Sequence, residues 1–242
     1  MRPVYKCGEY GKYFYFGVLR YSFLIDILPA GWYIFEKGVI VVCGRFYVEN
    51  DIPAEELKQI IDEVNRKLQS KPEFEQVKMP LGEIFPTNIV PVIAPNKQHI
   101  ATPYPMQWGF TMQGKGQPLI NARAESVLEK PIFRKPALER RCLIPASNYF
   151  EWEKQGAKKI KHALRDPISQ VIYMAGIYRY EQEKQLPVFV ILTRDAAPGI
   201  RFIHDRMPVI LPKDEQLAWI SDSSNITGIL ATALDDIVSE AV

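Results

Sequence analysis

The sequence predicts a single α+β domain with a mainly antiparallel, barrel-like β core and flanking helices. From Asn88 onward, short apolar and β-branched runs are separated by Pro and Gly, as in antiparallel sheets and barrels. One long amphipathic helix precedes these runs, and no repeat, low-complexity tract or domain linker is visible. Apolar residues make up 47% of the 242 residues, which is enough for a substantial core.

The clearest element is a helix over Asp51–Gln69, which we expect to cover one side of the sheet. Acidic residues near its start and basic residues near its end suit the helix dipole. The apolar residues at helical spacing on one face are Leu57, Ile60, Ile61, Val64 and Leu68. A polar connection, Lys71–Pro86, follows this helix.

The strands come next, with turns expected at Gly114–Gln117 and Gln182–Gln185 and a short helix over Asp214–Ser221. The predicted strands are Ile89–Ala94, Gln107–Met112, Arg141–Ala146, Tyr149–Glu153, Val171–Tyr180, Val188–Thr193 and Met207–Leu211.

Residues 1–42 differ from the rest of the chain, being rich in aromatic residues without a persistent helical or strand period. Arg20 and Asp26 interrupt the apolar run, which argues against a signal peptide and against a membrane span. We therefore divide the chain into an N-terminal extension, 1–42, and a catalytic domain, 43–242.

Charge and cysteine content limit the possible functions. The formal net charge is only +2, so a nucleic-acid site would have to be a local patch. The cysteines Cys7, Cys43 and Cys142 form no close pair, which argues against a zinc site and a disulfide framework and fits a reducing cytoplasm. We expect Cys142 to be a core residue and no cofactor or metal to be needed.

Cys43 is the residue around which the chain is organised. It follows the apolar run Val39–Val42 and precedes Gly44 and Arg45. A guanidinium beside a thiol favours the thiolate, and Gly44 lets the backbone approach a ligand. A buried structural cysteine is the plain alternative.

Four polar clusters interrupt the apolar strands, and together they contain a thiol, a carboxylate and an imidazole, the groups of a covalent catalytic site. Each group also has a structural interpretation: Arg123 and Glu125 could form a surface pair, Glu151 could lie on an exposed strand face, and His204 could be a loop residue. The clusters are Cys43–Arg45, Asn121–Glu125, Asn148–Trp152 and Ile203–Pro208.

These clusters, with Trp108-Gly109 and Arg141–Ala146, resemble the SOS-response-associated peptidase (SRAP) family in their residues and order, over about residues 43–235. The resemblance implies a single domain with a barrel-like β core that binds abasic sites in single-stranded DNA. It also implies a covalent link to them through an N-terminal cysteine.

The resemblance further implies roles for individual residues. Cys43 matches the nucleophile, whose α-amine forms a Schiff base with the opened sugar and whose thiol closes a thiazolidine ring. Glu151 matches the carboxylate that orients or deprotonates the amine, and His204 the acid–base group that opens the sugar and supports reversal. Asn121 matches the asparagine beside the sugar.

The implied DNA contacts come from five residues. Arg45 and Arg123 match phosphate contacts, and Thr193 matches a polar residue near the site. Pro91 and Trp108 look like the apolar surface that splays the strand, in keeping with bases that stack on aromatic rings.

Elementary chemistry supports an N-terminal cysteine in this role. The ring needs an amine and a thiol on neighbouring carbons. A free α-amine, with a pKa of about 7.7–8.0, is partly unprotonated near neutral pH, and an imidazole exchanges protons there.

The sequence departs from the family at Asn148, where Gly is frequent, at Phe110-Thr111, and above all in that Cys43 is internal. An internal cysteine has an amide nitrogen and cannot form an imine. Either translation starts at Val42, read as an initiator that is then removed, or the protein's own thiol cleaves off residues 1–42. We favour the first explanation because 1–41 lacks the patterning of a folded segment.

We therefore predict a cytoplasmic, monomeric DNA-repair enzyme that associates with the nucleoid on damaged DNA, does not bind membranes, and has lyase-type Schiff-base chemistry. The first alternative is a cysteine (auto)peptidase that uses Cys43, His204 and Glu151. The second is a non-catalytic single-strand-binding module that uses Trp108 and the arginines.

Overall fold

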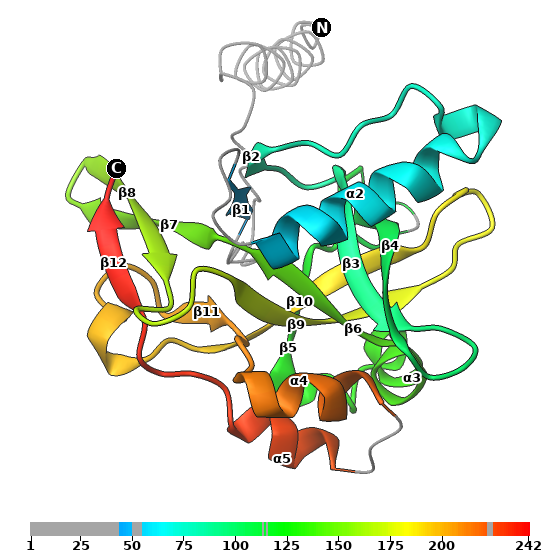
Figure 1. Ribbon diagram of the computed structural model, residues 1–242. Helices are drawn as coiled ribbons and strands as arrows, with labels where there is room; N and C mark the ends of the chain where they lie inside the picture. Colours follow the sequence, from blue (N-terminus) through cyan, green and yellow to red (C-terminus); the bar gives the residue numbers. More distant parts are fainter. Residues whose placement is uncertain (1–43, 50–54, 113, 115, 222–224) are drawn as a thin grey trace, which may run out of the picture. The chain divides into compact units, whose positions relative to one another are not determined.

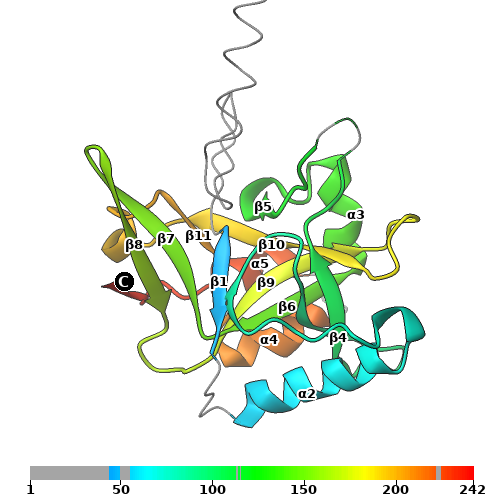
Figure 2. The ribbon, with the colours of Figure 1, turned by 90° about the horizontal axis from the view of Figure 1, so that it is seen from above.

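The structure is a computed structural model that describes residues 44–49, 55–112, 114, 116–221 and 225–242. The predictions for Val39–Val42, Cys43 and the extension 1–42 lie outside these residues. The described chain forms two sheets (Figures 1 and 2). Sheet A has, in spatial order, the strands β12 (Val238–Ala241), β8 (Lys158–Arg165), β7 (Asn148–Gln155), β1 (Arg45–Val48) and β2 (Gly82–Ile84).

Sheet B closes on itself, because β9 at one end pairs back onto β10. Its pairs are antiparallel except β4–β10 and β5–β10, which are parallel. The predicted mainly antiparallel, barrel-like core is thus confirmed, although the ring is uneven: β4 and β10 share only a short register at Gln107–Trp108. The strands are β11 (Arg206–Pro208), β10 (Val188–Asp195), β4 (Ala101–Trp108), β3 (Ile89–Pro95), β6 (Arg141–Ala146) and β9 (Ile172–Arg179), with β5 (Asn121–Arg123) beside β10.

Helices flank these sheets, as predicted. The long helix α2 (Glu55–Gln69) crosses β3 and β4, and α4 (Lys213–Ile220) packs on β6 beside α5 (Ile226–Ala231) (Figure 1). None of the helices described is long and apolar enough to cross a membrane. The other helical segments are α3 (Pro131–Glu139) and the short 3-10 turns η1 (Pro72–Phe74), η2 (Ala124–Ser126) and η3 (Pro198–Ile200).

Helix α2 is held by its apolar face and by polar contacts near both ends. The five apolar residues expected on one face are all buried. Near the start, the Tyr173 hydroxyl donates to Glu56 Oε1 at 2.6 Å; burial, together with this carboxylate, raises the pKa of Tyr173. Near the end, Lys67 Nζ donates to the Pro103 carbonyl at 2.6 Å.

The two sheets meet through three aromatic rings. Trp108 at the end of β4 lies 5.2 Å from Phe46 of β1 and 6.3 Å from Phe189 of β10, measured between ring centroids. All three side chains are completely buried. The apolar core is continuous across this contact, so it fixes which face of sheet A lies against which strands of sheet B.

Strand β4 begins at Ala101, six residues earlier than predicted, and the part that was not predicted contains Pro103 and Pro105. A proline cannot donate to a strand ladder, and this argued against a strand there. In the structure, β4 pairs with β10 only at Gln107 and Trp108, so the prolines lie where β4 has a single partner, β3.

A buried arginine joins the ends of two helices to the barrel. Arg141 is 4% exposed and starts β6. Its guanidinium donates to the Ala137 and Leu138 carbonyls of α3, at 2.9 Å each, and to the Trp219 carbonyl of α4 and the Ser221 carbonyl just after it. Carbonyls at a helix end lack intrahelical donors and carry partial negative charge, so one cation satisfies both ends.

We expect Arg141→Met to lower the free energy of unfolding by about 2–4 kcal/mol, since several buried carbonyls would lose their donor. Urea unfolding followed by far-UV circular dichroism measures this loss. Arg140→Met is the matched control. Its partner Glu139 lies 3.7 Å away on the surface, so its loss should be below about 1 kcal/mol. Equal losses for the two variants would contradict this account.

Candidate functional site

The carboxylate predicted to be catalytic lies on the inner face of sheet A. Phe46 pairs with Tyr149, and Glu151 is two residues further along β7, so Glu151 shares the face of these two core residues. Its side chain is buried, at 4% exposure. The β1–β7 register pairs Arg45 with Phe150 and, continued by one residue, brings Gly44 beside Glu151.

Asn121 and Thr193 lie on the face of sheet B that meets sheet A. Phe189, Ile191 and Thr193 alternate along one face of β10, and Asn121 of β5 is in register with Ile191. Thr193 is buried and Asn121 half-buried. Arg123 is in register with Thr193 and is exposed. The structure therefore brings Asn121, Thr193 and Arg123 to one surface, facing the sheet that carries Glu151.

A buried arginine ties this surface together. Arg206 donates to both oxygens of Glu125, at 2.7 and 2.8 Å, to Asp195 Oδ1 at 2.5 Å and to the Thr193 carbonyl at 2.7 Å. Burial opposes ionisation of Glu125, but the hydrogen bonds and the charge of Arg206, together with backbone hydrogen bonds, outweigh it and keep the pKa of Glu125 below its ordinary value. Glu125 thus pairs with Arg206, and the surface pair with Arg123 considered from the sequence is wrong.

His204 lies just before β11 and is held by the same arginine. Its Nδ1 is 3.0 Å from the Arg206 backbone nitrogen and also 3.0 Å from Asp205 Oδ1. Burial lowers the pKa of His204 and outweighs the opposite effect of Asp205. The lowered pKa favours the neutral ring. The Arg206 N–H favours the tautomer with the ring proton on Nε2, whereas the Asp205 carboxylate beside the same Nδ1 favours a proton on Nδ1.

The DNA roles expected of Trp108 and Pro91 do not fit their positions. Trp108 is completely buried and its indole N–H donates to the Ile120 carbonyl at 3.0 Å. Pro91 is buried in β3, in register with Pro105. Neither side chain has a free face on which a base could stack. Both belong to the core because β3 and β4 are inner strands of sheet B.

Arg45 lies on the opposite face of sheet A from Glu151, because it is in register with Phe150. It donates to Glu83 at 2.9 Å, and its guanidinium carbon lies 4.6 Å from the ring centre of Phe85 and 5.1 Å from that of Trp152. The structure therefore separates Arg45 from Asn121 and Thr193, which were expected at one site with it.

Of the three cysteines, only Cys142 lies within the described residues. It is completely buried, and burial raises the pKa of its thiol well above the ordinary value. The expectation that it is a core residue is confirmed, and such a thiol is a poor nucleophile. No group of three or more His, Cys, Asp and Glu side chains in the described part of the chain is arranged to hold a metal ion.

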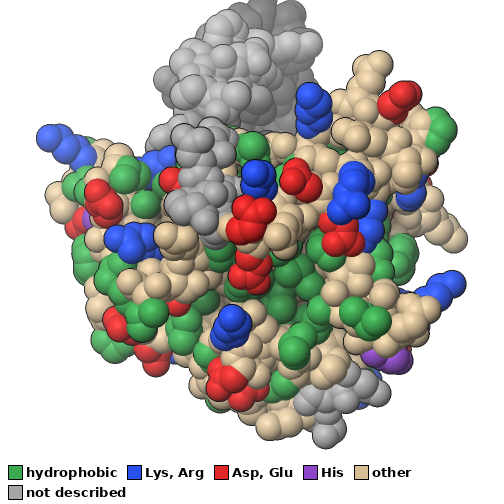
Figure 3. All heavy atoms as spheres, in the orientation of Figure 1, with side chains coloured by type: hydrophobic (Ala, Val, Ile, Leu, Met, Phe, Trp, Pro, Cys, Tyr) green, Lys and Arg blue, Asp and Glu red, His purple; other side chains and the backbone are tan. Residues whose placement is uncertain are grey.

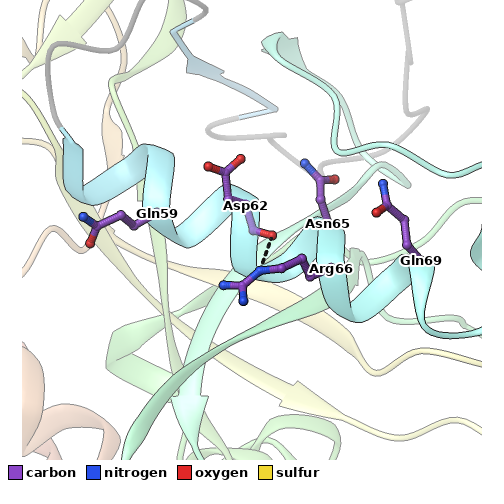
Figure 4. Close-up of a pocket in the computed structure, with 5 residues that line it drawn as sticks. All are labelled: Gln59, Asp62, Asn65, Arg66 and Gln69. Carbon is purple, nitrogen blue, oxygen red and sulfur yellow. Dashed lines mark hydrogen bonds between the residues drawn. The ribbon is translucent and has the colours of Figure 1, made fainter.

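A shallow polar depression runs along α2 (Figure 4). Asn65 Oδ1 accepts the Met79 N–H at 3.0 Å, and Arg66 Nε donates to the Asp62 carbonyl at 3.4 Å. Acidic and basic side chains are interspersed on the face seen in Figure 3, as on an ordinary solvated surface. The depression is lined by Gln59, Asp62, Asn65, Arg66 and Gln69, all from one helix, and lacks a reactive group.

Comparison with known proteins decides the family. The profile of the SOS response associated peptidase (SRAP) family matches residues 42–241. The chain belongs to the SRAP family. An X-ray structure of a protein from Bacteroides thetaiotaomicron shares the fold, with a TM-score of 0.63 at 21% identity, covering 83% of this chain and 92% of that one. A phage-related protein from Bordetella bronchiseptica gives a TM-score of 0.62 at 20% identity, covering 83% and 94% of the two chains.

Two curated SRAP relatives are named for the processing of abasic sites. The abasic site processing protein YoaM of Bacillus subtilis is 35% identical over 123 residues, which is 49% of this chain and 54% of YoaM. The abasic site processing protein YedK of Escherichia coli is 28% identical over 184 residues, 74% of this chain and 79% of YedK. The match thus spans only about half the length of YoaM.

Two residues beside the candidate site were not predicted from the sequence. Arg206 was noted only as part of a motif, because its role depends on partners 81 and 11 residues away along the chain. His162 went unnoticed because it lies among lysines in β8. The alternation of Ile160, His162 and Leu164 was the signal that could have revealed a half-buried strand there.

Glu125→Gln should loosen the candidate site by replacing a two-oxygen carboxylate contact with a neutral amide. The carboxylate stabilises the fold above the ordinary Glu pKa of about 4.3, and this contribution is lost as the pH falls through the lowered pKa. The variant should therefore lose stability at pH 7 and show a flatter decline in acid. Urea unfolding across this pH range provides the measurement.

The same variant should disturb His204, since Arg206 would no longer be held on both sides. The ¹⁵N shifts of the imidazole report which ring nitrogen carries the proton, and the Nε2–H form should become less dominant. Glu129→Gln, at an exposed position just before α3, is the control and should change neither property. Unchanged His204 shifts in Glu125→Gln would refute the positioning role of this network.

Proposed function

We propose that this chain is an abasic-site processing protein that binds single-stranded DNA and forms a reversible thiazolidine cross-link through Cys43 as the N-terminal residue of a domain spanning 43–242. The observation that carries the proposal, with family membership, is the placement of Glu151. A carboxylate buried on the inner face of a sheet is shielded from bulk water, so its charge acts strongly on groups beside it. This one lies beside Gly44, the residue that follows Cys43.

The reach of Cys43 follows from covalent geometry. Its Cα is about 3.8 Å from that of Gly44, whatever the conformation of residue 43. An α-amine on Cys43 therefore belongs to the residue directly before the strand position that pairs with Glu151. A lysine at the same place would be a poorer amine, because its pKa is about 10.4 and that of an α-amine is about 7.7–8.0.

The proposed chemistry has two bond-forming steps. The amine adds to the aldehyde carbon of the opened sugar, Glu151 takes up the amine proton, and loss of water leaves an imine. The thiol then adds to the imine carbon, and its proton moves to the nitrogen, which closes the thiazolidine. Each step can run backwards, so the link is reversible.

His204 is suited to the sugar ring. In the neutral tautomer that the Arg206 N–H favours, the proton is on Nε2, and this N–H is proposed to donate to the ring oxygen as the sugar opens. Asn121 and Thr193, on the facing surface, are the polar groups proposed to hold the sugar, and exposed Arg123 the one proposed to meet a phosphate. Arg45, on the other face of sheet A, is proposed to bind the strand as it leaves the site.

The alternative function, a cysteine peptidase that uses Cys43, His204 and Glu151, predicts a different product. If its substrate is the chain itself, it releases residues 1–42 and creates the free amine needed for the cross-link. An abasic oligonucleotide and the intact mass of the protein separate the two activities.

A chain that begins Met-Cys43, from which the methionine is removed in the cell, should form an SDS-resistant adduct with an abasic single strand. The 242-residue chain should not, because an amide nitrogen cannot form an imine. Denaturing gels with the intact mass of each protein provide the measurement, and the mass shows whether the long chain has been cleaved.

Cys43→Ser in the short chain is the matched control, because it keeps the amine and removes the thiol. It should give an adduct only after reduction with borohydride, which traps the labile imine. An equally fast and stable adduct from an uncleaved 242-residue chain would overturn the proposed function. An adduct from the long chain only after loss of residues 1–42 would support self-cleavage as the activating step.

A further inference from the structure

A second histidine lies next to Glu151. His162 of β8 is in register with Glu151 of β7, so both side chains are on the inner face of sheet A, with Cβ atoms about 5 Å apart. His162 is 7% exposed. Neither the family motifs nor the chemistry proposed above uses it.

The ring of His162 is held on one side only. Its Nε2 lies 3.0 Å from Glu153 Oε2, and Glu153 is two residues along β7 on the same face as Glu151. The hydrogen bond from Gln155 and then that from His162 lower the pKa of Glu153. Nδ1 of His162 is buried without a hydrogen-bond partner. Buried polar atoms nearly always have partners, so this atom is available for a proton or a donor.

The segment that carries His204 also touches this ring. Phe202, two residues before His204, meets His162 edge-on, with ring centroids 6.1 Å apart. Ala241 of β12 lies on its other side in the sheet. The titratable groups on the same face of the sheet as this ring are Glu151 and Glu153. The charged groups of the neighbouring strands on the far face are Lys154, Lys161, Arg165 and Glu240. The titratable and charged residues next to Phe202 in the chain are Arg201, His204 and Asp205.

We propose that His162, anchored by Glu153, is the proton store of the site and acts through Glu151. When Glu151 takes the proton from the Cys43 amine, Nδ1 of His162 accepts it in turn, and the imidazolium is balanced by Glu153. The proton then returns through Glu151 to the hydroxyl of the carbinolamine. The C–O bond breaks, water leaves and the C=N bond forms, so each proton removed from nitrogen ends on oxygen.

This inference rests on the proposed function and deepens it. Imine formation moves two protons in turn from nitrogen to oxygen, and a carboxylate holds only one proton at a time, so a second acceptor beside Glu151 can hold a proton between the two transfers. A histidine charges and discharges near neutral pH, so a carboxylate paired with it can be reset within one reaction cycle. His162 is therefore a positioning and proton-relay residue that does not itself contact the sugar.

The test is the pH dependence of adduct formation by the chain that begins Met-Cys43, with His162→Gln, Glu153→Gln and the control His99→Asn. Glutamine at 162 keeps a donor for Glu153 but cannot titrate. His99 lies in the exposed β3–β4 turn at φ 61°, a conformation that Asn tolerates. Binding of a non-reactive tetrahydrofuran analogue and thermal melting report folding and DNA affinity separately from chemistry.

His162→Gln should bind the analogue normally, form adduct about tenfold more slowly at neutral pH, and change the shape of the pH–rate profile. This loss is below the roughly 10²–10⁴-fold typical of acid–base groups that act on the substrate. Glu153→Gln should also slow adduct formation, because the imidazolium loses its counter-charge. His99→Asn should match the unchanged protein.

The outcomes separate the two claims. A His162→Gln profile that runs parallel to that of the unchanged protein at every pH, whether slower or not, would show a structural role and overturn the relay alone. If the unchanged short chain forms no adduct at any pH, the proposed function fails and the relay fails with it.

Discussion

The contact on which the site depends is the packing of Trp108 between Phe46 and Phe189. These rings join β1 of sheet A to β4 and β10 of sheet B at centroid distances of 5.2 and 6.3 Å. Strands fix the direction of every second side chain, so this contact also determines what lies further along each strand. Glu151 and His162 then occupy one face, and Asn121 and Thr193 the facing one. A change at Trp108 would alter the site from within the core.

Much of the fold could be predicted, because its signals are local. The apolar spacing of α2 and the apolar runs of β6, β9 and β10 identified these elements to within a few residues. Strand β8 and helix α3 were missed for local reasons as well: β8 is rich in lysine, and α3 has Pro136 in its interior. A barrel-like sheet could be predicted, but not which strands close it. The pairing of β9 with β10 and of β4 with β10 depends on contacts between segments far apart in the sequence.

The arrangement of the candidate site could not be predicted from the sequence. Motif order selected Glu151, His204 and Asn121, whose catalytic roles stay predictions. It did not indicate that Arg206 binds Glu125 and Asp195 or that His162 lies beside Glu151. Trp108 was expected at the DNA because aromatic rings often stack on bases, yet the same apolar surface also stabilises a core. Nothing in a local pattern separates these two uses, and burial decided for the core.

The central claim is that the reactive group is one residue with an amine and a thiol, next to Glu151. Mass spectrometry of the adduct formed by the chain that begins Met-Cys43, after digestion of protein and DNA, tests it directly. We expect the sugar remnant on the N-terminal peptide, at a mass lower by one water than that of the two components, with the Cys43 thiol no longer free to alkylation. A remnant on a lysine peptide, or an adduct whose Cys43 thiol still reacts, would contradict this account.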